Sequence, residues 1–415
     1  MDGIPLSQED RAILELESPT VAGHVCKVLS LPAPPDLGAL RDLVAAQIRS
    51  TPALTRRLGG TAAAPAWVPD PDFDVAQHVG AADPDALAAA DLPSAVARLF
   101  ERRLDRSRPL WRMDVVTLPD GSGALVWRIH HAVADGTTAM RYTRELLLDP
   151  AVPEGKAHPA HSASRAIDDA RRRAHLAGFL DREVASSRRR SPFDGRIGTR
   201  RRVAFASVDM RVLHDAAKAI DGAPLNDALL TVVAGALRRW LEHVHGSLGA
   251  VRVRVPVSLH HEGDDAGNRD SFFSVGLPVG EPDPVARLRA IHAATAVRKT
   301  EHDAEEMDTM LRELAVVSPR LERFWSRIEE SPRRFAVSVS NVPGPSGAMT
   351  MLGERVHALH SLAEIGARHA LRIAAVSFAG RLCLGFCADP GLVDDLEVMA
   401  GGAEADAAAL VEAAG

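Results

Sequence analysis

The pattern of apolar and polar positions along the chain predicts an alternation of helices and strands. Apolar residues recur at helical spacing over Gly38–Ser50, Ser94–Leu104 and Asn226–Val244, and Asn226 or Asp227 is expected to cap the last of these helices. Apolar runs on both sides of Pro119-Asp120-Gly121 predict a hairpin. Further strands are expected at four places: Val203–Val208, Val251–Leu259, Phe335–Val342 and Leu371–Phe386, the last as a hairpin turning at Gly380-Arg381.

The length of the chain favours two domains of mixed α/β structure. At 415 residues it exceeds what one hydrophobic core usually organises. Helical and strand patterns alternate in both halves. We therefore expect an N-terminal segment 1–148, a crossover or linker 149–202 and a C-terminal segment 203–415. Pro256 has no N–H to donate, so the strand around it is expected at a sheet edge or break.

Composition excludes several classes of protein. The net charge of −6 and pI of about 6.3 give no reason to expect a nucleic-acid partner. The three cysteines (Cys26, Cys383 and Cys387) are too few for a disulfide framework and lack the spacing of a zinc site, so reduced thiols and no bound metal are expected. The polar N-terminus has no signal-peptide pattern, and no apolar run is long enough to span a membrane. A cytoplasmic protein is therefore expected, and any membrane contact is expected to be peripheral.

Arginine is concentrated in the predicted crossover. From Arg165 to Arg202 there are twelve arginines against five acidic residues. Such a segment is usually a solvated helix and linker. The functional alternative is a surface that attracts the phosphates of coenzyme A or of an anionic membrane.

The sharpest chemical feature is the run His130-His131-Ala132-Val133-Ala134-Asp135-Gly136. It stands where a strand is predicted to end and a helix to begin, a position that holds side chains rigidly beside a cleft. A histidine there can remove a proton near neutral pH, because its unperturbed pKa is about 6.5. Asp135 could orient a histidine or anchor the turn, and Gly136 permits a tight turn or a close approach to substrate.

A second run of similar spacing, His260–Ala266, has alanine in the place of the glycine. It lies in an acidic loop, and we interpret it as an exposed loop without function. No Gly-x-Ser-x-Gly elbow and no phosphate-binding or dinucleotide fingerprint occurs. The sequence therefore favours a histidine base over a covalent nucleophile.

The chain resembles the bacterial wax ester synthase/acyl-CoA:diacylglycerol acyltransferase family, within the group that shares the fold of chloramphenicol acetyltransferase and condensation domains. The resemblance depends on short motifs that follow the family's order nearly from end to end. These motifs are Pro5-Leu6-Ser7 with Asp10 and Glu17, Trp67, Phe73-Asp74, His78-Val79, Arg108-Pro109-Leu110-Trp111, His130 to Gly136, Gly195 with Arg200-Arg201-Arg202, Asn226-Asp227, Val255-Pro256-Val257-Ser258, Gly267-Asn268, and Ser340-Asn341-Val342-Pro343-Gly344-Pro345. The segment after Pro150 is shorter than the family's, and Phe193-Asp194 stands where an asparagine is expected before Gly195.

The resemblance implies two chloramphenicol acetyltransferase-like subdomains, each a mixed sheet flanked by helices, with the active site at their interface. It implies direct transfer of a fatty acyl group from acyl-CoA, a co-substrate, to an alcohol, with His131 as general base and no further cofactor. His130, Asp135 and Gly136 are expected to shape the catalytic turn.

Four residues are candidates for substrate contact. Trp111 has packing as its alternative role, and Asn226 has helix capping. Ser340 and Asn341 are expected at a strand end beside the substrate tunnel.

Two alternatives to a wax ester synthase or diacylglycerol acyltransferase stay open. One is an acyltransferase of specialised metabolism that acylates a sugar, a polyketide or an amine. The other is a non-catalytic lipid-binding protein of the same fold. A lipid acceptor would bring the cytoplasmic protein into peripheral contact with the inner membrane or with lipid droplets.

Overall fold

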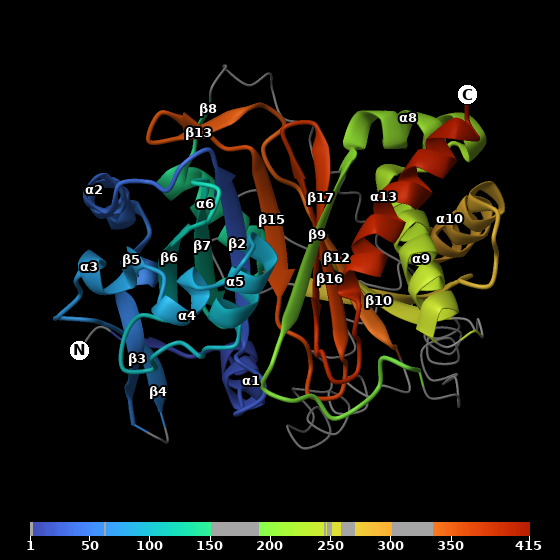
Figure 1. Cartoon of the computed structure of the whole chain (residues 1–415). Helices are drawn as coiled ribbons and strands as arrows, with labels where there is room; N and C mark the ends of the chain where they lie inside the picture. Colours follow the sequence, from blue (N-terminus) through green and yellow to red (C-terminus); the bar gives the residue numbers. More distant parts are fainter. Residues whose placement is uncertain are drawn as a thin grey trace.

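A computed structural model describes residues 3–61, 64–150, 191–244, 246, 251–258, 270–300 and 335–415. Two sheets stand side by side in the middle of the molecule. The first belongs mostly to the N-terminal half, and a layer of helices lies on the far side of the second (Figure 1). The Arg-rich segment up to residue 190 and the run His260–Ala266 lie outside the described residues. The predicted domain boundaries at residues 148 and 202 stay predictions.

The first sheet has five strands in the order β15-β2-β7-β6-β5. β6 and β7 form the predicted hairpin, and β2 pairs with β7 along its whole length. Every residue of β7 is buried, as expected for a strand covered on both faces. The strands are β2 (His24–Leu31), β5 (Val79–Ala81), β6 (Trp111–Thr117), β7 (Gly123–His130) and β15 (Ala358–Ala363).

Helices cover both faces of this sheet. α2 (Leu37–Gln47) and α6 (Gly136–Leu147) pack on one face with Leu29, Trp127 and Ile129. α4 (Pro84–Leu87) and α5 (Leu92–Phe100) pack on the other, where Val96 and Phe100 meet Val126. The helical spacing of α5 gives it one apolar face, and burying each large side chain contributes roughly 1.5–3 kcal/mol. The smaller elements of this half are β1 (Ile4–Pro5), α1 (Gln8–Leu16), η1 (Ile48–Ser50), η2 (Pro52–Thr55), β3 (Arg56–Gly60), β4 (Pro65–Pro69) and α3 (Val75–His78).

The second sheet has six strands in the order β11-β10-β12-β16-β17-β9. β10, β12 and β16 run parallel, and the other neighbours are antiparallel. The strands are β9 (Arg202–Asp209), β10 (Val251–Ser258), β11 (Asp270–Leu277), β12 (Val337–Val342), β16 (Leu371–Phe378) and β17 (Arg381–Ala388).

A layer of helices covers the face of the six-stranded sheet that is turned away from the N-terminal half (Figure 1). The predicted stripe of α9 is buried except at its last member, Val244, which is 40% exposed; its buried members are Leu230, Val233, Leu237, Trp240 and Leu241. Asp227 in the first turn of α9 accepts a hydrogen bond from His292 at 2.7 Å, which joins α9 to α10. The helices are α8 (Met210–Asp221), α9 (Leu225–Val244), α10 (Pro284–Thr300) and α13 (Leu396–Glu412).

The two halves are interlocked. β15 comes late in the chain yet completes the first sheet, where it pairs with β2, and it packs across β16 and β17 of the second sheet. Gly385 allows this close approach, because a Cβ there would lie 2.2 Å from the carbonyl oxygen of Ser361. A small sheet also joins the halves, with β8 (Asp149–Pro150) beside β13 (Met349–Met351) and β14 (Glu354–Arg355).

A buried ion pair adds a polar link between the halves. Arg201 donates from Nε to Glu364 at 2.9 Å, and both side chains are enclosed. Arg201 also donates to the carbonyl oxygens of Thr20 and Gly198. The segments before β2, before β9 and after β15 are thereby held together.

The predicted elements are confirmed, although the helix expected over Ser94–Leu104 ends at Phe100. Of the two alternatives for Pro256, a sheet edge or a break, the structure shows the break. β11 and β12 flank β10, but β12 pairs only with Val253 and Arg254, before the proline is reached. The predicted cap of α9 is wrong. Asn226 and Asp227 do not cap α9; they lie in its first turn, where the N–H of Asp227 donates to the carbonyl of Pro224.

Candidate active site

The turn between β7 and α6 holds two neighbouring histidines at the end of a strand. β7 ends at His130, and Asp135 caps α6 by accepting the N–H of Thr138 at 2.6 Å. The N–H of His131 donates to the carbonyl of Gly23 at 2.9 Å. Because an N-cap contributes about 1 kcal/mol and the other end is tied to Gly23, the backbone of the turn is fixed at both ends.

The ring of His130 is enclosed and has a neighbour at each nitrogen. Its Nδ1 accepts the N–H of Ala132 at 3.1 Å, and its Nε2 lies 3.3 Å from Oε2 of Glu17. Since Nδ1 is an acceptor, the proton of the neutral ring is on Nε2 and faces Glu17. Gly23, with a φ of +71°, leaves the space for this ring, because a Cβ there would lie 2.8 Å from Nε2. His130 therefore orients the turn and offers no nitrogen to a substrate.

Glu17 is a member of the site whose role its sequence position did not reveal. Its carboxylate pairs with Arg103 at 3.2 Å and with Arg106 at 2.9 Å, in addition to His130. Burial alone would raise the pKa of Glu17, but hydrogen bonds from His130 and Arg106 outweigh burial and hold the pKa below its ordinary value. A charged carboxylate therefore faces the protonated nitrogen of His130.

His131 stands at the interface of the two halves. The residue is half-buried, and its Nδ1 is enclosed. Burial lowers the pKa of His131 to about 4, and the positive charge of Arg372 acts in the same direction, whereas Asp135 opposes it. The imidazole is therefore neutral at neutral pH, which is the form that can accept a proton.

Arg372 approaches His131 from the second sheet. Its guanidinium donates to the carbonyl of Glu364 at 3.0 Å, and the N–H of Glu364 donates to the carbonyl of His24 at 3.1 Å. The residue before His24 is Gly23, which holds the backbone of His131. Neighbouring peptide groups therefore position both side chains. The sequence offered no signal for Arg372, because His131, whose pKa it lowers, lies far away along the chain.

The end of β12 also reaches the catalytic turn. Val342 packs in one cluster with Ala139 of α6, and its Cγ2 would lie 3.1 Å from a Cβ at Gly136. Gly136 thus permits α6 and β12 to meet. Since successive strand residues point to opposite faces, Ser340 shares the face of Val342, and Asn341 points to the other side. Both Ser340 and Asn341 are half-buried.

The structure does not bring the other two candidates to His131. Trp111 is 2% exposed, donates from Nε1 to the carbonyl of Leu54 at 2.7 Å and stacks on His78 at 4.5 Å, so its contacts are those of a packed core residue. Asn226 lies on α9, behind the second sheet as seen from the N-terminal half (Figure 1).

A buried lysine lies on the same face of the first sheet as α6. Nζ of Lys27 donates to Oγ of Ser361 at 2.8 Å, and the side chain is wholly enclosed. Burial lowers the pKa of Lys27 to about 8, and Asp135 acts against this. Lys27 of β2 therefore lies close enough to the carboxylate of Asp135, the cap of α6, for the two groups to interact electrostatically.

Other kinds of chemistry find little support in the described part of the chain. Burial raises the pKa of the Cys26 thiol to about 12, so it stays protonated and is a poor nucleophile. Within the described ranges, no group of three or more His, Cys, Asp or Glu residues could hold a metal ion. In the same ranges no single helix is long and apolar enough to cross a membrane; α8 and α9 pass that test only as a pair bent by 99°.

Solved structures share this fold over nearly the whole chain. The wax ester synthase/diacylglycerol acyltransferase from Marinobacter aquaeolei superposes with a TM-score of 0.70 at 22% identity, covering 99% of each chain. The starter condensation domain of rhizomide synthetase superposes with a TM-score of 0.63 at 13% identity, covering 99% of this chain and 94% of its own. The fold is thus that of the chloramphenicol acetyltransferase and condensation-domain group, as predicted.

Sequence comparison identifies the kind of enzyme. The wax ester synthase/diacylglycerol acyltransferase catalytic domain matches residues 6–186, and the WS/DGAT C-terminal domain matches residues 266–410. A Mycobacterium tuberculosis protein named as a diacylglycerol O-acyltransferase is 28% identical over 450 residues, covering 96% of this chain and 88% of that protein. A second, named as a probable diacylglycerol O-acyltransferase, is 29% identical over 380 residues, covering 84% and 81%.

Fold and sequence relatives together define an acyltransferase. More narrowly, the chain belongs to the wax ester synthase/diacylglycerol acyltransferase family.

Proposed function

We propose that the protein transfers a fatty acyl group from acyl-CoA to the hydroxyl of a lipid alcohol, either a diacylglycerol or a long-chain alcohol, with His131 as the general base. The observation that carries this proposal is the position of His131: a neutral imidazole at the interface of the halves, beside a cation from the second sheet. The names of the relatives support diacylglycerol or a long-chain alcohol as the acceptor.

The reaction needs one proton acceptor and one stabilised oxyanion. His131 takes the proton of the acceptor hydroxyl while its oxygen attacks the thioester carbon. The tetrahedral intermediate then collapses, the carbon–sulfur bond breaks, and the imidazolium returns the proton to the coenzyme A sulfur. A general base of this kind contributes about 10²–10⁴-fold in rate.

Arg372 supplies the positive charge for the oxyanion in this proposal. A cation beside His131 lowers the basicity of the imidazole, which by itself would slow proton removal. The same cation becomes favourable once negative charge develops on the substrate. In the tetrahedral intermediate the thioester oxygen carries that charge, and a fixed guanidinium then stabilises it without reorganisation. Its hydrogen bond to Glu364 holds the guanidinium in place.

No cofactor beyond acyl-CoA takes part in this scheme. Activity should therefore survive dialysis against a metal chelator. Because the acceptor is a lipid, we expect the cytoplasmic protein to meet it at the surface of the inner membrane or of lipid droplets, which co-flotation with vesicles that contain diacylglycerol would reveal.

The test is the release of free thiol from palmitoyl-CoA in the presence of hexadecanol, diacylglycerol or a polar acceptor. His131→Ala should lower the rate at least tenfold without changing the melting temperature by more than a few degrees. His214→Ala, at a partly exposed histidine of α8, is the matched control and should keep full activity. Wild-type transfer to a sugar or amine alone would overturn the lipid acceptor, and a His131→Ala rate above a tenth of wild type would overturn the base.

A further inference from the structure

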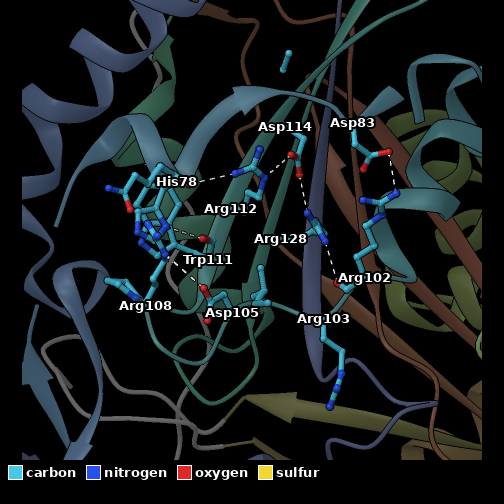
Figure 2. Close-up of a pocket in the computed structure, with 14 residues that line it drawn as sticks. His78, Asp83, Arg102, Arg103, Asp105, Arg108, Trp111, Arg112, Asp114 and Arg128 are labelled. Carbon is cyan, nitrogen blue, oxygen red and sulfur yellow. Dashed lines mark hydrogen bonds and ion pairs between the residues drawn. The ribbon is translucent and has the colours of Figure 1, made fainter. Parts of the chain in front are cut away.

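A cavity opens on the face of the first sheet that carries α4 and α5, away from α6. Its volume is about 620 Å³, and Figure 2 shows Asp114 between Arg112 and Arg128, with Arg102 turned toward Asp83. The cavity is close to the catalytic turn, because Arg128 of its lining stands two residues before His130, roughly 7 Å along an extended strand. Five lining residues are arginines: Arg102, Arg103, Arg108, Arg112 and Arg128.

The bottom of the cavity holds a net positive charge. Asp114 accepts from Nε of Arg112 at 2.7 Å and from a terminal nitrogen of Arg128 at 2.8 Å, so one carboxylate serves two guanidinium groups. The side chains of Asp114 and Arg128 are 2% and 4% exposed. Arg112, which is 37% exposed, shares its only carboxylate partner with the buried Arg128, so an anion that reaches Arg112 would be stabilised.

Arg128 is held rigidly beside the cavity. Its NH1 group donates to the carbonyls of Leu99 and Arg102, at 2.7 and 2.9 Å, which fixes the plane of the guanidinium. These carbonyls are neutral, so the charge of Arg128 is balanced only by Asp114, which it shares with Arg112.

The rim arginines are paired, but loosely. Arg108 is 45% exposed and lies 3.4 Å from Asp105, itself 60% exposed. Arg102 is 48% exposed and pairs with Asp83 and Asp85. Exposed pairs such as those of Arg108 and Arg102 contribute about 0–1 kcal/mol, so a multivalent anion can exchange with them. Arg103 is different, because its partner Glu17 is buried. The excess positive charge is therefore that of Arg112 and Arg128 around Asp114, and Arg108 at the rim can leave Asp105 for an anion.

We propose that this cavity binds a phosphate group, with Arg112 and Arg128 below it and Arg108 at its mouth. A tetrahedral dianion accepts hydrogen bonds from several directions, whereas a planar carboxylate suits a single guanidinium fork. Two sources present that chemistry: the phosphates of coenzyme A and the headgroup of an anionic phospholipid. Only the coenzyme A source rests on the proposed function.

Four variants separate this site from general charge attraction. Arg112→Gln should raise the Kd for a phosphate ligand about tenfold, since it loses a charge-assisted hydrogen bond. Arg108→Gln should raise it about threefold, and Asp105→Asn should lower it, because that change removes a competing carboxylate. Arg98→Gln removes an exposed arginine of α5 outside the cavity and should leave the Kd unchanged. Asp114 keeps Arg128 as a partner in Arg112→Gln, so this variant should still fold.

The probes identify the source. Calorimetric titration of the whole chain with inorganic phosphate, coenzyme A and 3′-dephospho-coenzyme A measures soluble ligands. Co-sedimentation with phosphatidylcholine vesicles, with and without phosphatidic acid, measures the lipid headgroup. The site is supported where at least one probe binds with the expected order of the four variants, and that probe names the ligand class.

Two results would overturn the site: no probe binds the wild-type chain at millimolar concentration, or Arg112→Gln and Arg108→Gln leave every Kd within twofold. His131→Ala should keep its phosphate affinity. Transfer activity and phosphate binding therefore fail independently, and a failed base assignment would not be mistaken for a failed phosphate site.

Discussion

Replacing Gly23 by alanine tests how the catalytic turn is held. Gly23 has a φ of +71°, a conformation that costs an alanine roughly 1–2 kcal/mol. The new Cβ would also stand 2.8 Å from Nε2 of His130, so the ring must move. Moving it breaks the hydrogen bond between Nδ1 and Ala132, about 1 kcal/mol, and separates Nε2 from Glu17. We expect a total loss of about 2–4 kcal/mol.

A matched glycine separates the two causes of that loss. Gly222 closes α8 with a φ of +65°, and nothing lies within 4 Å of a Cβ built there. Gly222→Ala should therefore show the conformational cost alone, roughly 1–2 kcal/mol. The difference between the two variants measures the displacement of His130.

The assay combines urea unfolding with thiol release at saturating substrate. Gly23→Ala should lose more stability than Gly222→Ala, and it should also lose activity, because the carbonyl of Gly23 holds the N–H of His131. Equal destabilisation of the two variants, with transfer by Gly23→Ala intact, would refute the idea that this glycine exists to seat the His130 ring.

Three further predictions follow from the charged groups around the site. Arg372→Gln should raise the pKa of His131 and therefore shift the acid limb of the pH profile of kcat to higher pH. We expect kcat to fall by a larger factor than KM rises. An acid limb that does not move would contradict the proximity of Arg372 to His131. Burial lowers the pKa values of His131 and His369 to about 4. The unfolded chain therefore binds more protons than the folded protein below about pH 6.5, and the folded protein loses stability as the pH falls from there toward 4. The urea midpoint should be lower at pH 5 than at pH 7, and equal midpoints would show that these rings are not held neutral. Arg201→Met leaves Glu364 buried without its partner and should lower the free energy of unfolding by about 3–5 kcal/mol. Arg202→Met removes one partner of an exposed pair and should lower it by less than about 1 kcal/mol. Calorimetric melting measures both, and similar melting temperatures would disprove the idea that Arg201 and Glu364 hold the two halves together.

The local elements could be predicted because their signals are local. The stripe of α9 and the hairpin of β6 and β7 depend on periodicities within a few turns or strand lengths of sequence. The catalytic turn is equally local, since Asp135 caps a helix that starts at the next residue. Even the misplaced cap of α9 was an error of only two or three residues.

The composition of the site was decided by tertiary structure. His131 is held by Gly23, more than a hundred residues earlier, and its neighbouring cation is Arg372, on a strand of the other sheet. β15 joins a sheet whose other strands all precede residue 131. The sequence alone determined the helices, the strands and the histidine turn, because short-range spacing fixes backbone hydrogen bonds and apolar faces. Which charges surround that histidine depends on contacts between distant segments, and these arise only when the two sheets pack against each other and exclude water.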